Sequence, residues 1–172
     1  MTKNAFVSLL LFLLMVFLQI ICNRICLFNI AVPFVFIYFI LKLPLTLSVN
    51  WVITLSFLIG LVVDIFSNTH GMFTMSSVIL AIIRKPVFSL FYPREDEMTI
   101  PIPSIRTLGV SNYIKYMYTL SLLFCVCIYV IQLFTFNNII LSLLRILGSS
   151  TLTAIILFGF DSIANTRREK RL

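Results

Sequence analysis

Long apolar stretches separated by short polar interruptions dominate the chain. From Ala5 to Ile83 only three residues carry a formal charge, namely Arg24, Lys42 and Asp64. A helix that crosses the hydrocarbon of a bilayer needs about 20 mainly apolar residues. The apolar runs therefore predict six membrane-spanning helices, at about residues 5–22, 27–41, 45–63, 71–90, 116–134 and 139–160.

Two of these predicted spans carry features that set their limits. The second span is short, contains Pro33 and ends before Pro44, because proline lacks an N–H donor and disfavours helix in the residue before it. The fourth is too short if it stops at Arg84 and Lys85. We therefore expect it to continue to about residue 90, with both cations extending to the membrane interface.

Composition agrees with a membrane protein. The chain of 172 residues is 60% hydrophobic and 11% charged, with a mean hydropathy of +1.10, whereas about 25% of the residues of a soluble domain are charged. The fold class that we predict is a compact, all-α bundle of about six transmembrane helices. Residues 1–172 form one membrane domain, with a loop at about residues 91–115 and a basic tail at 161–172.

The distribution of cations predicts the orientation of the bundle. If both termini are cytoplasmic, eleven cations lie in cytoplasmic segments and only Arg24 lies in an outer connection, while Arg145 falls within the last span. This excess predicts cytoplasmic termini, a cytoplasmic loop 91–115 and an outer position for residues 64–70. The net charge of +7 needs no nucleic acid as partner, and the basic tail is suited to anionic membrane lipid.

The segment GLVVDIFSNTHG, from Gly60 to Gly71, joins the third and fourth predicted spans. It contains Asp64, Asn68 and the only histidine of the chain, His70. An acid exposed to hydrocarbon costs at least ~2.5 kcal/mol, so Asp64 needs a partner. We expect Asp64 to cap a helix or to form a buried pair, with Arg145 as the candidate cation, and Asn68 and His70 to shape the outer loop.

Polar and small residues also recur within two of the spans at helical spacing, which places them on one face of each helix. Such stripes pack helices closely and form hydrogen bonds between them. They could pack within the bundle, line a ligand pocket or face a partner. The stripes comprise Asn138, Ser142, Arg145, Ser149 and Thr153 in the last span, and Gly71, Thr74, Ser77 and Ala81 in the fourth.

Sequence signals for catalysis and cofactors are nearly absent. The chain has no glycine-rich phosphate loop, and a single histidine argues against the usual paired-histidine metal sites. Its four cysteines fall in apolar segments without C-x-x-C spacing, which is typical of small buried hydrophobes. We therefore predict no catalytic site, no cofactor and no metal.

Four features of the sequence occur together in a characteristic order. They are the glycine and aspartate of GLVVDIFSNTHG with its closing glycine, Pro33 of the second span, RKPVFSLFYPRE after the fourth, and RILGSSTLT in the last. In this combination the chain resembles the MreD family, the rod shape-determining membrane proteins of bacteria. The resemblance implies a fold similar to the six-helix substrate-binding components of energy-coupling-factor vitamin transporters. It also implies a non-enzymatic scaffold of the wall-elongation machinery in the bacterial inner membrane. The implied partners are a bitopic MreC-like protein, MreB, RodA and a class B penicillin-binding transpeptidase.

Two other functional classes fit part of the sequence. A substrate-binding component of a vitamin transporter would present an outer pocket, but the first helix reads AFVSLLLFLLMVF and lacks the A-x-x-x-A contact of those components. A small membrane enzyme acting on a lipid could use Asp64 and His70 as acid and base. Neither a nucleophile nor a metal cluster accompanies these two residues in the sequence, so we prefer the scaffold.

Overall fold

The computed structural model describes residues 2–24, 31–92, 103, 105–133 and 139–169 of the chain. This part of the chain is all-helical. Its helices are α1 (Thr2–Arg24), α2 (Ile37–Lys42), α3 (Val49–Ser67), α4 (Met72–Phe91), α5 (Ile105–Leu133) and α6 (Ile139–Glu169).

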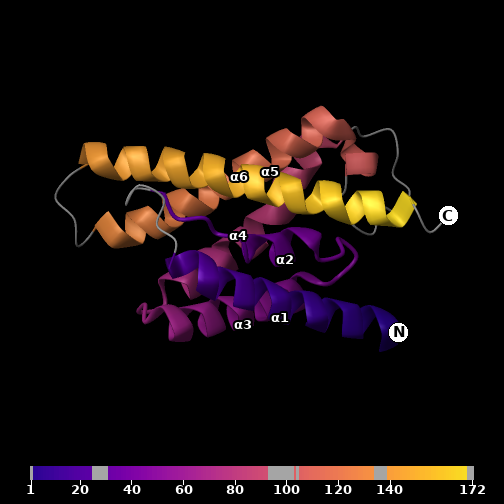
Figure 1. The fold of residues 1–172 in the computed structure, drawn as a ribbon, viewed down its shortest axis with the longest axis horizontal. Helices are drawn as coiled ribbons and strands as arrows, with labels where there is room; N and C mark the ends of the chain where they lie inside the picture. The colour runs from indigo at the N-terminus through magenta and orange to yellow at the C-terminus, as the bar shows by residue number, and fades with distance from the viewer. Residues whose placement is uncertain (1, 25–30, 93–102, 104, 134–138, 170–172) are drawn as a thin grey trace.

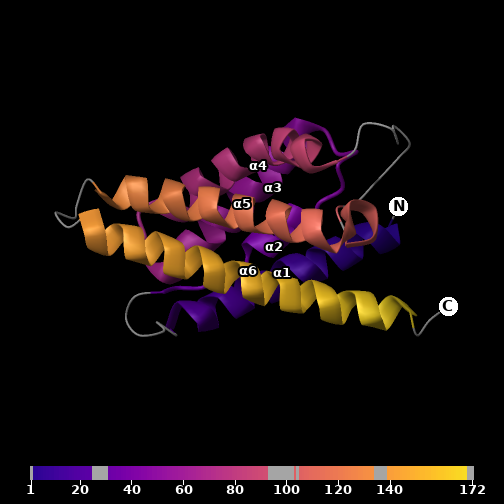
Figure 2. The same ribbon diagram turned by 90° about the horizontal axis from the view of Figure 1, so that it is seen from above.

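The helices form an elongated bundle in which successive elements run up and down along one long axis (Figure 1). Helices α5 and α6 lie on one side, α1 and α3 on the other, and α2 and α4 between them. Close contacts join α3 to α4, α4 to α5, and α5 to α6. The beginning of α1 and the end of α6 lie at the same end of the bundle (Figure 2), as the predicted topology requires.

Four helical segments are long and apolar enough to cross a membrane, which indicates a multi-pass membrane protein. They are Val49–Ser67, Met72–Phe91, Leu108–Gln132 and Ser142–Ser162. The apolar part of α1 described with its side chains, Leu10–Asn23, is shorter. The four long segments overlap the third to sixth predicted spans, and the shorter apolar helix overlaps the first. The orientation of the bundle in the membrane stays a prediction.

The second predicted span is wrong. Of residues 27–41, residues 27–30 lie outside the described part of the chain, and 31–36 are not helical. Helix begins only at Ile37 and ends at Lys42. The extended stretch and the short helix still carry the chain along much of the bundle (Figure 1), because 31–42 cover roughly 25 Å of a ~30 Å hydrocarbon core.

Three predicted boundaries also differ from the structure. Helix α3 begins and ends about one turn later than the predicted span 45–63. Helix α5 begins at Ile105, inside the predicted loop 91–115, and contains a break at Gly109, whose φ of 75° suits glycine. Helix α6 continues through most of the predicted tail, to Glu169. The helices continue through the polar residues near their ends, so hydropathy alone does not show where each helix stops.

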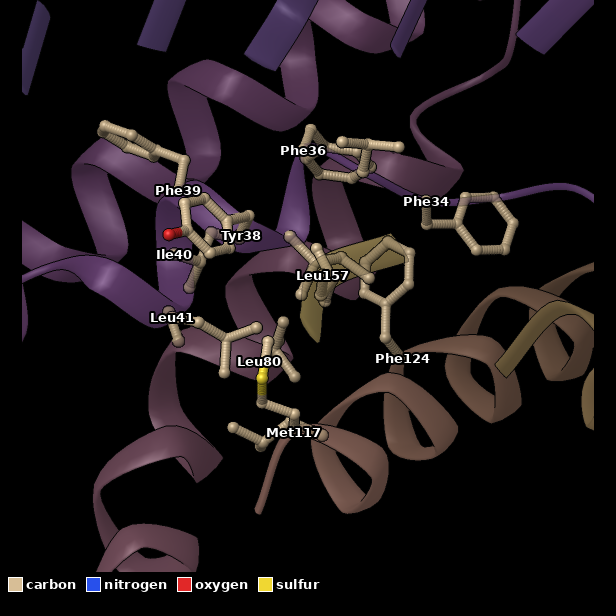
Figure 3. Packing of buried hydrophobic residues seen from close by; sticks show 14 of the residues in the cluster. Phe34, Phe36, Tyr38, Phe39, Ile40, Leu41, Leu80, Met117, Phe124 and Leu157 are labelled. Carbon is tan, nitrogen blue, oxygen red and sulfur yellow. The ribbon is translucent and has the colours of Figure 1, made fainter. Parts of the chain in front are cut away.

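The segment 34–41 occupies the centre of the bundle, and all eight of its residues are buried. Phe34 and Phe36 each pack against both Phe73 of α4 and Phe124 of α5, with ring centroids 5.4–6.0 Å apart. Figure 3 shows this segment pointing its side chains among those of α4, α5 and α6. The core is therefore built around the short helix α2 and the non-helical residues that precede it.

Candidate functional site

The sequence candidate Asp64 lies in the last turn of α3 and caps the beginning of α4. Asp64 is 5% exposed. It accepts hydrogen bonds from the backbone N–H groups of Phe73 (3.2 Å) and Thr74 (2.8 Å) and from the hydroxyls of Thr69 and Thr74. The first N–H groups of a helix have no partner within the helix, and the helix dipole favours a negative charge there. Asp64 thus joins α3 to α4 as a structural cap.

The turn between α3 and α4 depends on two residues with positive φ. Asn68 ends α3 in the left-handed conformation, at φ 53° and ψ 43°, and Gly71 begins α4 at φ 78°. Asparagine and glycine are the residues that most readily adopt this conformation. Asn68 and His70 are exposed in this turn. His70 is not among the groups that contact Asp64.

The expected pair between Asp64 and Arg145 does not form. The partners of Asp64 all lie in the turn and the first residues of α4, whereas Arg145 is half-buried on α6. An open pocket of about 440 Å³ lies beside Asp64. The pocket is lined by Leu61, Asp64, Ile65, Asn68, Thr69, Gly71, Thr74 and Met75.

The stripe of small residues on α4 faces α3 rather than a partner. Ser77 is fully buried, and its hydroxyl donates to the carbonyl oxygen of Ser56 at 2.8 Å. A Cβ atom on Gly60 would lie 2.6 Å from the Cα of Thr74, which leaves room only for glycine. Thr74 and Ala81 are also buried. Thr74 and Ser77 of this stripe therefore pack within the bundle, against α3.

The expectation that Arg84 extends to the membrane interface is wrong. Arg84 is 2% exposed, whereas the next residue, Lys85, is exposed. The Arg84 guanidinium donates hydrogen bonds to the carbonyl oxygens of Ile40, Leu43 and Pro44. These carbonyls lie at the end of α2, where helix carbonyls lack partners and a cation is favoured. Arg84 therefore caps α2 from a neighbouring helix.

Side chains from two helices hold the extended segment in place, and we call this set the side-chain ladder. On one side, Ser149 Oγ accepts from the N–H of Val32 (3.2 Å) and Thr153 Oγ1 accepts from the N–H of Phe34 (3.1 Å). Residues four apart on a helix rise by about 6 Å, which matches the ~6.6 Å between alternate residues of a strand. The hydroxyls of α6 therefore act like the edge of a neighbouring strand.

Gln19 of α1 completes the ladder from the opposite helix. Its side-chain amide accepts from the N–H of Phe36 (3.3 Å) and donates to the carbonyl oxygen of Pro33 (3.1 Å). Irregular backbone at membrane depth is tolerated only where it is buried in protein or lines a water-filled cavity, because lipid offers no hydrogen bonds. The ladder supplies those bonds. Sequence reasoning placed Ser149 and Thr153 on a polar stripe but missed Gln19, a lone amide within an apolar span.

A second cluster that sequence reasoning missed contains Asp161 near the end of α6. Asp161 is 4% exposed and forms an ion pair with Lys42 of α2. It also accepts a hydrogen bond from the Tyr38 hydroxyl at 3.1 Å. The Lys42 ammonium lies 5.3 Å from the ring centroid of Tyr113 on α5. Lys42 in turn donates to the carbonyl oxygen of Pro103. This cluster ties α2, α5 and α6 together at the end of the bundle where α6 finishes.

Comparisons with known proteins do not assign this chain to a family. No family model matches the chain, and neither the curated proteins nor the solved structures contain a match. Within the described residues, no group of three or more histidine, cysteine, aspartate or glutamate side chains could hold a metal ion. The resemblance to the MreD family therefore rests on the sequence motifs.

Proposed function

We propose that this protein is a non-enzymatic scaffold of the cell-wall elongation machinery in the bacterial inner membrane, as the resemblance to the MreD family implies. In this proposal it binds partner membrane proteins, first an MreC-like bitopic protein. It thereby helps to position RodA, a class B penicillin-binding transpeptidase and MreB. Four apolar candidate spans support a membrane location, and the scaffold role is the part that needs testing.

The observation that favours a scaffold over an enzyme is the saturation of Asp64. A carboxylate offers about four acceptor positions, and Asp64 receives four hydrogen bonds from Thr69, Phe73 and Thr74. It has no free lone pair with which to take a proton from a substrate. Arg84 and Ser149 are likewise engaged with backbone groups. These three polar side chains thus stabilise the fold.

A second candidate, the substrate-binding component of a vitamin transporter, rests on the pocket beside Asp64. Its volume of about 440 Å³ falls in the ~300–1,000 Å³ range of small-molecule sites. The pocket is open rather than enclosed, whereas such sites usually bury most of their ligand. We therefore rank this candidate second.

Deleting the gene should separate the two candidates. We expect cells that are otherwise rod-shaped to become round, with uptake of vitamins unchanged. An affinity-tagged chain should retain an MreC-like protein in mild detergent at high salt, because helix packing does not depend on surface charges that salt screens. An unrelated multi-pass protein with the same tag is the control for nonspecific capture. Normal cell shape with lost vitamin uptake would replace the scaffold with the transporter component.

The predicted orientation can be tested by labelling single cysteines introduced into a cysteine-free variant. The excess of cations in the proposed cytoplasmic segments predicts that a cysteine at Asn68 reacts with an impermeant thiol reagent in intact cells. A cysteine at Ser104, in the predicted cytoplasmic loop, should react only after the cells are opened. Labelling of Ser104→Cys from outside would reverse the topology.

A further inference from the structure

The polar side of the open pocket beside Asp64 offers hydrogen-bond acceptors. Thr69 and Thr74 both line this pocket, and each donates its hydroxyl proton to the Asp64 carboxylate. A hydroxyl has one donor and two acceptor lone pairs. Because both protons are already used, the two hydroxyl oxygens have only lone pairs left for a ligand. This side of the pocket therefore suits a ligand that donates hydrogen bonds.

The charge of Asp64 adds to this preference. Asp64 also lines the pocket, and the groups that bond to it are neutral N–H and hydroxyl groups. Within the part of the chain that the structure describes, no cation forms an ion pair with it. The positive end of α4 supplies only about half an elementary charge, which leaves part of the negative charge uncompensated. A cation is therefore favoured in the pocket, and an anion is disfavoured.

The rest of the pocket is largely apolar. Leu61, Ile65 and Met75 form what we call the apolar wall, and Ile65 and Met75 are 68% and 61% exposed. Both belong to candidate membrane spans, and the α3–α4 turn lies at the end of the bundle away from the two termini (Figure 1). The described residues contain no group of three or more side chains that could hold a metal ion. The ligand that fits is therefore an organic cation with an apolar body.

We propose that this pocket binds the ammonium end of an amphipathic amine. The ammonium donates hydrogen bonds to the hydroxyl oxygens of Thr69 and Thr74 and lies near the charge of Asp64, while the apolar body covers the apolar wall. An open pocket of about 440 Å³ holds one end of such a molecule and leaves the remainder in the bilayer. Two sources share this chemistry, a free amphipathic amine and the headgroup of a lipid such as phosphatidylethanolamine. Binding moves no proton, so the site goes beyond the scaffold role without depending on it.

Binding of hexylammonium, with hexanol as its neutral counterpart, tests the proposal on the purified protein in detergent. We expect hexylammonium to bind about tenfold more tightly than hexanol, because only the ammonium is attracted by the charge of Asp64. Titrating the amide NMR signal of Thr69 with each compound gives the two dissociation constants and reports on the pocket rather than on partition into the micelle. Equal affinities, or no binding of hexylammonium, would overturn the proposal.

Met75→Trp and Ile79→Trp are the matched variants. Met75 lines the pocket, whereas Ile79, one turn further along α4, does not, and both side chains are exposed, so a larger one can be accommodated. Met75→Trp should fill the pocket and abolish hexylammonium binding, because it leaves the hydrogen bonds of Asp64 intact and removes only the space. Ile79→Trp should bind hexylammonium like the wild type. Wild-type affinity in Met75→Trp would place the binding elsewhere and reject the site.

Asp64→Asn tests the part played by charge. It should bring the affinities for hexylammonium and hexanol close together, because asparagine keeps the shape of the side chain and removes its charge. An unchanged preference for hexylammonium in this variant would contradict the proposal.

Lipid retention identifies the source of the amine. The protein is reconstituted into vesicles with equal amounts of phosphatidylethanolamine and phosphatidylglycerol and extracted in mild detergent, and its retained lipid is identified by native mass spectrometry. Preferential retention of phosphatidylethanolamine by the wild type and Ile79→Trp, but not by Met75→Trp, would identify the lipid headgroup as the ligand. Equal retention of both lipids by a protein that binds hexylammonium would identify a free amine. A preference for the anionic phosphatidylglycerol that Met75→Trp removes would overturn the proposal.

Discussion

Replacing Asp64 by alanine should lower the free energy of unfolding by about 2–6 kcal/mol, because it leaves the buried N–H groups of Phe73 and Thr74 without an acceptor at roughly 1–3 kcal/mol each. The Thr69 and Thr74 hydroxyls, which also bond to Asp64, can rotate to other acceptors and add less. Equilibrium unfolding in mixed micelles would measure the loss. If Asp64 acts only as a cap, the protein should become less stable and no other property of the α3–α4 turn should change.

Asp64→Asn and His70→Ala are the matched variants for this experiment. Asparagine keeps the shape and one acceptor oxygen but loses the favourable charge at the start of α4, worth about 0.3–1 kcal/mol, so it should cost less than alanine. His70 is exposed, and its replacement should stay within about 0.5 kcal/mol of the wild type. Wild-type stability in Asp64→Ala would refute the cap. Unchanged stability with lost function in Asp64→Asn would instead assign Asp64 a chemical role.

The sequence was sufficient for the long helices because their signal is local. Each of α3, α4, α5 and α6 contains a window of apolar residues that is long enough to cross a bilayer. Helix ends were less predictable. Helix α3 ends at Ser67, three residues beyond the charge at Asp64. The helix can continue past this charge because the carboxylate accepts hydrogen bonds from the start of α4 and does not need water.

The prediction of the second span was wrong because the conformation of its first residues depends on contacts with residues far away in the sequence. Residues 31–36 are as apolar as a helical span, but their backbone bonds to Ser149 and Thr153, which are 117 and 119 residues away from the groups they bind. Pro33 was the only local sign. Nothing near it in the sequence indicates that α6 offers two hydroxyls at the spacing of a strand.

The same reasoning explains why the role of Arg84 was mistaken and why Asp161 was missed. Asp64 was correctly expected to cap or pair, since a lone acid between apolar segments needs a partner. Arg84 was taken for an interfacial cation because the fourth span would be too short if it stopped there, and the carbonyls that Arg84 caps lie 40 to 44 residues earlier. Asp161 was missed because its partner Lys42 lies 119 residues earlier in the sequence. Long-range pairing of single polar residues leaves no periodic pattern.

The side-chain ladder predicts a loss of stability of similar size to that at Asp64, and α6 contains its own control. Thr153→Val keeps the shape of the side chain but removes the acceptor for the Phe34 N–H, and Ser149→Ala does the same for Val32. The double variant should therefore lose about 2–6 kcal/mol, at roughly 1–3 kcal/mol for each stranded N–H, because the hydrocarbon supplies no replacement.

The control is Thr151→Val, since the Thr151 hydroxyl is exposed and bonds only to carbonyls of its own helix, those of Leu147 and Gly148. It should be nearly neutral. Amide hydrogen exchange gives a local readout, because breaking the ladder should speed exchange at Val32 and Phe34 before the bundle as a whole unfolds. Equal effects of Thr153→Val and Thr151→Val, or unchanged exchange at Phe34 in the double variant, would mean that aromatic packing around Phe34 and Phe36 alone holds the segment extended. A larger loss of stability in Thr153→Val than in Thr151→Val would identify the hydroxyls of α6 as the groups that fix the conformation of the extended segment.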